Sequence, residues 1–137
     1  MRHLATTLIL LLAAITSAGC GDDDPIDLPS QPTPVVVTET FGGTLTVNGA
    51  QTHVFNVDRA GTVTAQLRTL SDQAATLGVS LGTYNGAACA IIITNTAAVL
   101  NTTVTGTAQS TGRFCVWVND VGRLAAGVDY SIEVTHF

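Results

Sequence analysis

Apolar and polar residues alternate along most of the chain after residue 40. Every second residue is apolar in the segments 62–68, 77–82, 113–119 and 130–135, and most positions between them are polar or small. A period of two is typical of β-strands that bury one face and expose the other. The pattern therefore predicts strands rather than helices over this part of the chain.

Turn-forming residues separate the alternating segments. Asn48-Gly49 and Asn85-Gly86 are strong tight-turn dipeptides. The helix-like windows 71–76 and 97–100 are too short to form stable helices. We therefore expect an all-β domain over residues 39–137, an antiparallel β-sandwich or jelly roll of about eight strands.

The alternation also predicts which side chains share the apolar face of each strand. These positions are Leu45, Val47, His53, Phe55, Val57, Val63, Ala65, Leu67, Leu77, Val79, Leu81, Phe114, Val116, Val118, Tyr130, Ile132 and Val134. The opposite face of segment 113–119 then carries Trp117 together with Arg113 and Asn119. An exposed tryptophan beside arginine and asparagine offers a contact for sugar or protein, because aromatic rings supply rigid amphipathic area. The alternative is that Trp117 packs across a disulfide or under a loop, since tryptophan is highly buried on average.

The first 19 residues have the features of a bacterial export signal. A short basic head precedes the apolar run 4–15, which is too short to span a membrane. The ending Ser17-Ala18-Gly19-Cys20 resembles a lipobox, in which the cysteine is lipidated and the chain is cut just before it. The resemblance implies a signal peptide at 1–19, a lipid anchor on Cys20 and display on the bacterial cell envelope.

The segment 20–38 differs in composition from the rest of the chain. It holds all four prolines, and Asp22, Asp23, Asp24 and Asp27 supply much of a net charge of −5. Such a segment predicts an extended, solvated tether. All five basic residues are arginines and they form no basic stripe, so we expect no nucleic-acid partner.

Three cysteines are present, and lipidation of Cys20 would leave an even pair. Exported proteins fold in oxidising compartments, so Cys89 and Cys115 are predicted to form a disulfide. Two buried free thiols are the alternative. No other cysteine or histidine lies at the spacing of zinc ligands, and we expect neither a metal nor a cofactor.

One motif is compatible with catalysis. Residues 78–82 fit the G-x-S-x-G pattern of serine hydrolases, and Asp120, Asp129 and His136 follow Ser80 in the usual order. That motif needs a strand-to-helix turn, whereas the flanking residues alternate as a strand and no helix is expected after Gly82. We therefore expect no enzyme, and hydrolysis through Ser80 is a remote alternative.

The remaining ionisable residues have structural interpretations. His53 and His136 fall on apolar strand faces, where a hydrogen-bonded histidine is the usual case. Asp120 and Asp129 bracket a glycine-containing loop and are expected to form turns rather than a calcium site, because Ca²⁺ takes six or more oxygen ligands.

Four segments resemble a known family. Residues 61–65, 77–82, 112–120 and 130–134 look like the corresponding strands of bacterial pre-peptidase C-terminal domains. The resemblance implies a small non-catalytic β-sandwich of an exported protein. Acidic residues that often flank the family's equivalent of strand 77–82 are missing, so no calcium site is carried over.

These observations predict a lipid-anchored, non-catalytic envelope module. It would bind cell-surface or wall carbohydrate or act as an accessory domain. The alternative is a protein-interaction or structural module of an envelope complex.

Overall fold

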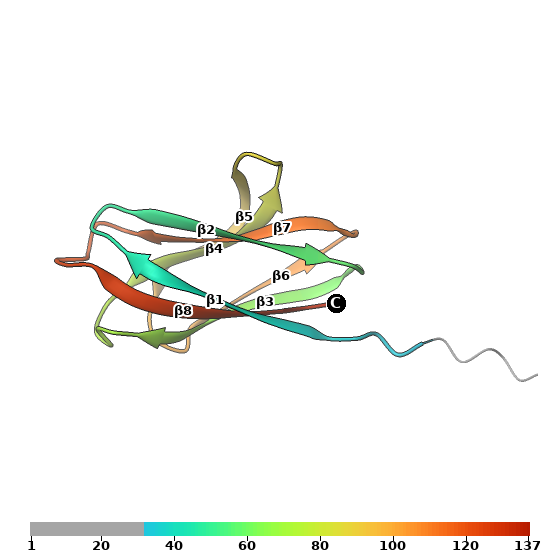
Figure 1. Cartoon of the computed structure of the whole chain (residues 1–137), viewed down its shortest axis with the longest axis horizontal. Helices are drawn as coiled ribbons and strands as arrows, with labels where there is room; N and C mark the ends of the chain where they lie inside the picture. Colours follow the sequence, from blue (N-terminus) through green and yellow to red (C-terminus); the bar gives the residue numbers. More distant parts are fainter. Residues whose placement is uncertain (1–31) are drawn as a thin grey trace, which may run out of the picture. The chain divides into compact units, whose positions relative to one another are not determined.

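The computed structural model describes residues 32–137, so the expected signal peptide, Cys20 and most of the expected tether lie outside the described residues. Residues 33–137 form one compact unit of eight strands, without a helix among the described residues (Figure 1). The strands are β1 (Val37–Leu45), β2 (Ala50–Val57), β3 (Gly61–Leu70), β4 (Leu77–Tyr84), β5 (Cys89–Ala98), β6 (Thr103–Ala108), β7 (Gly112–Asp120) and β8 (Val128–His136). Since β1 begins at Val37, the last two residues of the expected tether are part of the sheet.

The strands form two antiparallel sheets that face one another. The first sheet has the order β1-β8-β3-β6 and the second has the order β2-β7-β4-β5 (Figure 1). Only the β4–β5 connection joins neighbouring strands within one sheet. The architecture confirms the predicted β-sandwich.

The core lies between the sheets and is formed by the faces that the alternation predicts. Fully buried residues come from both sheets, including Leu67 and Ile132 from the first and Leu77, Val79 and Val116 from the second. Phe114 and His53 are only partly buried. Each Å² of apolar surface that is buried contributes about 25 cal/mol to stability. This shared core is therefore the main source of the domain's stability.

The prediction for Val47 was wrong. Strand β1 ends at Leu45, and Val47 is 43% exposed in the turn after it. The amide of Gly49 donates to the carbonyl oxygen of Thr46 at 2.9 Å, and Asn48 has a φ of 56°. The predicted turn at Asn48-Gly49 is therefore present, and it begins early enough to move Val47 out of the strand.

The predicted disulfide between Cys89 and Cys115 is present. The two residues belong to β5 and β7, which are separated in the sheet by β4. Strands two places apart are normally about 10 Å apart, yet these Cα atoms are separated by 5.8 Å. The β4–β5 hairpin must therefore bend over the outer face of β4, and Figure 1 shows its tip standing clear of the sandwich.

Gly82 makes this bend possible. It pairs with Cys115 on one side and with Ile91 on the other, under the point where β5 turns. A Cβ atom at Gly82 would collide with the carbonyl oxygen of Ala90. Only glycine allows such a close approach of two backbones.

Candidate functional site

Trp117 lies at the centre of the outer face of the second sheet. Its neighbours across the strands are Thr52 on β2 and Ser80 on β4. The side chain points away from the core, whereas the adjacent Val116 and Val118 are fully buried. Trp117 is half-buried, so part of its ring surface remains available for a contact.

Arg113 and Asn119 share this face but do not converge on Trp117. The Arg113 guanidinium lies over the Tyr84 ring, 4.7 Å from its centroid. The Asn119 side-chain amide donates to the carbonyl oxygen of Asp120 at 3.1 Å. Arg113 is four residues from Trp117 and so roughly 13 Å away along the strand, whereas Asn119 is two residues away. The predicted trio therefore forms a line along β7 rather than a pocket.

The β4–β5 hairpin is the most distinctive surface feature of the domain. We call residues 84–92 the hairpin tip. Its turn is held by the Asn85 side chain, whose Oδ1 accepts from the amides of Ala87 and Ala88 at 2.9 and 2.8 Å. Its base is held to β7 by the disulfide and by the stacking of Arg113 on Tyr84.

The tip carries exposed aliphatic side chains. Ile91 is 45% exposed and Ile92 is 67% exposed. The register between β4 and β5 shifts after Leu81, where Ile93 and Ile91 pair with consecutive residues of β4 and leave Ile92 without a partner. This bulge turns Ile92 outward on an edge strand, where exposed apolar residues are normally avoided.

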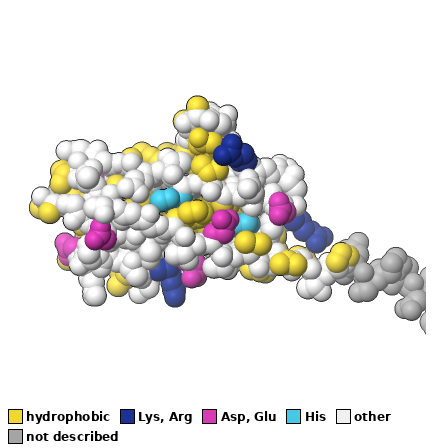
Figure 2. All heavy atoms as spheres, viewed as in Figure 1, with side chains coloured by type: hydrophobic (Ala, Val, Ile, Leu, Met, Phe, Trp, Pro, Cys, Tyr) yellow, Lys and Arg dark blue, Asp and Glu magenta, His cyan; other side chains and the backbone are white. Residues whose placement is uncertain are grey.

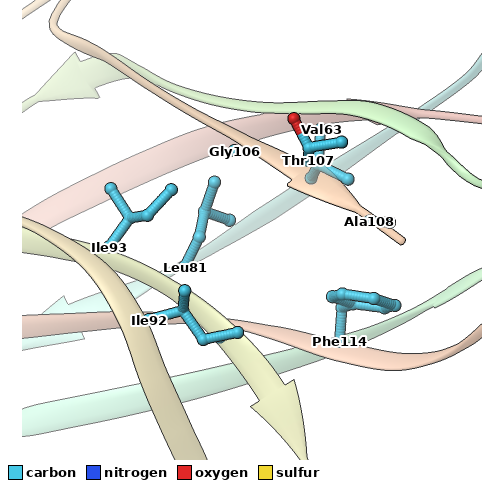
Figure 3. Close-up of a pocket in the computed structure, with 9 residues that line it drawn as sticks. Val63, Leu81, Ile92, Ile93, Gly106, Thr107, Ala108 and Phe114 are labelled. Atoms are coloured by element: carbon cyan, nitrogen blue, oxygen red, sulfur yellow. The ribbon is translucent and has the colours of Figure 1, made fainter. Parts of the chain in front are cut away.

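A small apolar hollow lies beside the tip, at the side of the sandwich where β5 and β6 are the free edges (Figure 3). Its volume is about 30 Å³, and it is lined by Val63, Leu81, Gly82, Ile92, Ile93, Gly106, Thr107, Ala108 and Phe114. Gly106 leaves the space open, because a Cβ atom there would lie 3.1 Å from Cδ1 of Ile93. A space of this size fits one aliphatic group.

A second, wider hollow of about 400 Å³ lies between the β3–β4 and β7–β8 loops. Small residues such as Ala74, Ala125 and Gly127 line much of it. Asp72 also lines it, but one of its carboxylate oxygens already accepts from the amide of Ala74. Thr76 and Arg123 supply its other polar side chains, but the wall has no aromatic residue, whereas small-ligand sites are lined mainly by hydrophobic and aromatic side chains.

Ser80 is placed as a structural residue. It lies in the middle of β4, is fully buried, and its hydroxyl is 2.8 Å from that of Thr94. β4 continues to Tyr84 without a helix, and no hydrogen bond among residues 32–137 joins Ser80 to Asp120, Asp129 or His136. The geometry lacks the exposed nucleophile on a sharp turn that the hydrolase motif requires.

His53 belongs to a polar chain that connects the sheets. Its Nε2 atom lies 2.7 Å from the Tyr130 hydroxyl, which donates to Oε1 of Gln51 at 2.9 Å. The Gln51 amide in turn donates to the carbonyl oxygen of Thr44 at 2.7 Å. Because the tyrosine hydroxyl is used as a donor, Nε2 of His53 carries the proton that completes the chain.

Burial shifts the pKa values of two side chains in this hydrogen-bonded series. It lowers the pKa of His53 and raises the pKa of Tyr130 to about 12. The His53 ring is also stacked on Phe41, with ring centroids 5.2 Å apart. The neutral imidazole therefore fits its surroundings better than the charged form.

The second histidine is also structural, as predicted. His136 is 3% exposed, its ring stacks on Phe55, and its Nε2 lies 3.0 Å from a carboxylate oxygen of Glu39. It therefore ties the end of β8 to β1.

Asp120 has the turn-forming role that was predicted. Its carboxylate accepts from the amide of Asn48 at 2.8 Å and from the amides of Gly122, Arg123 and Leu124. The hydrogen bond from the Asn48 amide is the main cause that lowers the pKa of Asp120. The same prediction was wrong for Asp129, which lies within β8, pairs with Thr44 of β1 and accepts a hydrogen bond from its hydroxyl. Within residues 32–137 there is no cluster of three or more potential metal ligands.

No family model matches the chain, and no curated protein sequence matches it. Solved structures of similar fold include a mitogen derived from Yersinia pseudotuberculosis, with a TM-score of 0.59 and 16% sequence identity. That match covers 75% of this chain and 88% of the mitogen.

A second similar structure is PliG of Aeromonas hydrophila, a periplasmic inhibitor of g-type lysozyme. Its TM-score is 0.54 at 14% identity, and the match covers 71% of this chain and 83% of PliG. At these identities the likeness shows a shared β-sandwich fold. Among the described residues no helix is long and apolar enough to cross a membrane.

The sequence pattern did not reveal the hairpin tip. The run Ala90–Ile93 is continuously apolar, a pattern typical of a strand buried on both faces. The signal that marks it as exposed is the placement of Asn85-Gly86 and Cys89 immediately before it. A tight turn with a cross-linked cysteine just after it identifies a hairpin end rather than an interior strand.

Proposed function

We propose that this protein is an exported, lipid-anchored and non-catalytic β-sandwich module that binds a protein partner in the cell envelope through the hairpin tip. The observation that carries the proposal is the exposure of Ile91 and Ile92 on a hairpin braced by a disulfide. Convex apolar surface of this kind fits a concave apolar site on another protein.

The bracing supports a binding role because it reduces the entropy that binding would otherwise cost. The tip is held by the disulfide, the Asn85 turn and the Arg113–Tyr84 stack, so the isoleucines are already positioned. Strand β5 and the turn before it contain no charged residue. A partner that contacts β5 and this turn would therefore bury no charged side chain of these segments, and Arg113 at the base of the tip is the nearby charge.

Export and anchoring are part of the proposal. A disulfide persists in oxidising compartments, which supports export. The lipobox-like sequence at Cys20 supports a lipid anchor, and we keep the kinship with pre-peptidase C-terminal domains as a proposal resting on the resemblance of its strand sequences. The similarity in fold to a periplasmic lysozyme inhibitor supports the idea that such a sandwich binds an envelope protein.

Site-specific photo-crosslinking in intact cells tests this function. A photoreactive amino acid replaces Ile91 in one strain and Thr105 in a control strain, because Thr105 is exposed on the outer face of the other sheet. We expect one discrete heterologous adduct from position 91 and none from position 105. Equal adduct patterns from both positions, or no adduct at all, would refute binding through the hairpin tip.

Carbohydrate binding is a second candidate, because Trp117 is half-buried on the outer face beside Thr52 and Asn119. The single tryptophan serves as its reporter. Titration of the parent chain with cell-wall fragments should give a saturable shift in tryptophan emission. Calorimetry, which needs no tryptophan, should show weaker binding by Trp117→Phe and unchanged binding by Thr105→Ala. A flat response across the panel removes the support for this candidate.

A further inference from the structure

Two surface features of the domain complement each other. One is an exposed aliphatic segment before β1, residues 33–36, which we call the arm. The other is the apolar hollow between β5 and β6.

The arm is an extension of β1 without a pairing strand. β1 begins at Val37, whose partner is His136, and β8 ends at that residue. The preceding residues Val35 and Val36 are 77% and 55% exposed. Two valines on an extended segment with unused backbone hydrogen-bonding groups can add to the edge of another sheet.

The hollow has the chemistry to receive such a segment. Its walls include the side chains of Val63, Leu81, Ile93 and Phe114, and about 30 Å³ of space remains above Gly106. Both β5 and β6 have a free edge beside it. An added strand would pair with an edge and place one valine side chain in the hollow.

The arm and the hollow lie at the same end of the sandwich. His136 ends the β8 strand beside Val37, and Thr135 pairs with Thr64 of β3. Thr62 pairs with Thr107, which lines the hollow. Yet β1 and β6 are opposite edges of the sheet, and the arm continues away from the sandwich in Figure 1. A neighbouring copy that presents the same end can therefore supply the arm without the chain crossing its own sheet.

Charge favours the same arrangement. The sequence that precedes the arm contains Asp22, Asp23, Asp24 and Asp27. Arg113 is exposed next to Phe114 of the hollow, whereas Arg59 shares this end of the domain with the carboxylates of Asp58 and Glu39. An Arg side chain is visible beside the hairpin in Figure 2. An incoming arm would bring acidic residues toward Arg113, the exposed cation beside the hollow.

We infer that two copies of this chain exchange arms, each placing Val35 or Val36 in the hollow of the other. Such an exchange is two-fold symmetric and therefore closes as a dimer rather than growing into a fibre. The proposed lipid anchor would hold copies on one membrane and so raise their effective concentration. The inference goes beyond the proposed function and does not depend on a heterologous partner.

Sedimentation equilibrium of the chain from Gly21 tests the exchange, since the compact unit 33–137 contains the complete core and disulfide. We expect a reversible dimer that weakens as salt is added. The double variant Val35→Lys/Val36→Lys should weaken the dimer by at least about tenfold. Val99→Lys is the control for adding lysine at an exposed valine, because Val99 is 45% exposed and does not line the hollow.

A complementation experiment separates arm exchange from a merely structural effect. Gly106→Ala fills the hollow, with its Cβ 3.1 Å from Ile93 and 3.6 Å from Leu81, so a small adjustment accommodates it. This variant should also dimerise weakly. A mixture of the arm variant and the Gly106→Ala variant should form a heterodimer, because one intact arm meets one intact hollow.

Three outcomes would overturn the inference. They are a wild-type monomer at about 1 mM, a dimer unaffected by the arm variant, and a mixture that does not complement. A dimer lost only in Ile91→Lys would instead indicate pairing through the hairpin tip. The photo-crosslink from position 91 to another protein reports on the proposed function separately, so the two ideas can fail independently.

Discussion

The guanidinium group of Arg113 lies over the ring of Tyr84, with Cζ 4.7 Å from the ring centroid. The contact joins β7 to the end of β4, where the hairpin tip begins. We expect Arg113→Ala to lower the free energy of unfolding by about 0.5–1 kcal/mol, the usual range for an exposed cation–π pair. Urea denaturation of Arg113→Ala, Tyr84→Leu and the double variant measures the coupling, and additive losses would contradict a direct interaction.

Reduction of the disulfide should release the hairpin. Removing a cross-link between residues 26 apart is expected to cost roughly 3 kcal/mol. Chemical denaturation of Cys89→Ala/Cys115→Ala against the parent chain measures this. Hydrogen exchange should show the largest loss of protection in residues 84–92, and a uniform loss across all strands would contradict the bracing role.

Gly82→Ala should destabilise the fold more than the addition of one methyl group usually does. The added methyl group collides with the carbonyl oxygen of Ala90, so the hairpin must lift away from β4 at a cost of about 1–3 kcal/mol. Gly127→Ala is the control, because its new Cβ would meet its nearest atoms at 3.6 Å. Equal melting temperatures for the two variants would show that the hairpin bends less closely over β4.

Ser80 should not react with a fluorophosphonate probe. Its side chain is fully buried and its hydroxyl bonds to that of Thr94. Ser80→Ala should instead cost about 1 kcal/mol of stability through the lost hydrogen bond. Covalent labelling that disappears in Ser80→Ala would reverse this interpretation.

Acidification should destabilise the domain through His53. Its folded-state pKa lies below the ordinary value of 6.5 because burial disfavours the charged ring. The unfolded chain therefore binds the proton more readily, so the stabilisation is complete above about pH 6.5 and declines as the pH falls toward the folded-state pKa. Melting temperatures between about pH 8 and pH 5 should fall more for the parent chain than for His53→Gln. Parallel curves would show that His53 does not contribute.

Acidification should also destabilise the domain through Asp120, but in a lower pH range than through His53. Its pKa is depressed, so its contribution is present above the ordinary value of 3.8 and declines as the pH falls through the folded-state value. A comparison with Asp120→Asn below about pH 4 separates this carboxylate from His53.

The period-two pattern could predict the strands and most of the core, because one buried face per strand determines residues such as Leu67, Val79 and Ile132. The disulfide could be predicted because lipidation of Cys20 would leave two cysteines, and exported proteins fold in an oxidising compartment. The alternation could also place Trp117 on the outer face, although it gave no measure of its exposure.

Three features could not be predicted because they depend on contacts between distant segments. The exposure of Val47 results from where the pairing of β1 with β8 ends. The outward position of Ile92 results from a register shift against β4. The polar chain from His53 to Thr44 requires knowledge that β2 faces β1 and β8 across the sandwich.

The position of β8 has a consequence for the proposed export of this protein. Among the strands of residues 32–137, β8 is the one that pairs with β1, and it also separates β1 from β3. Until residues 128–136 emerge, the first sheet consists of an unpartnered β1 and an isolated β3–β6 pair. Two strands alone are marginally stable in water, and the second sheet, complete by Asp120, then lacks the full partner sheet that buries its apolar face, so the core closes only once β8 is present. In the proposed export, the polypeptide can therefore cross the membrane before the sandwich is complete. Folding then finishes on the other side of that membrane.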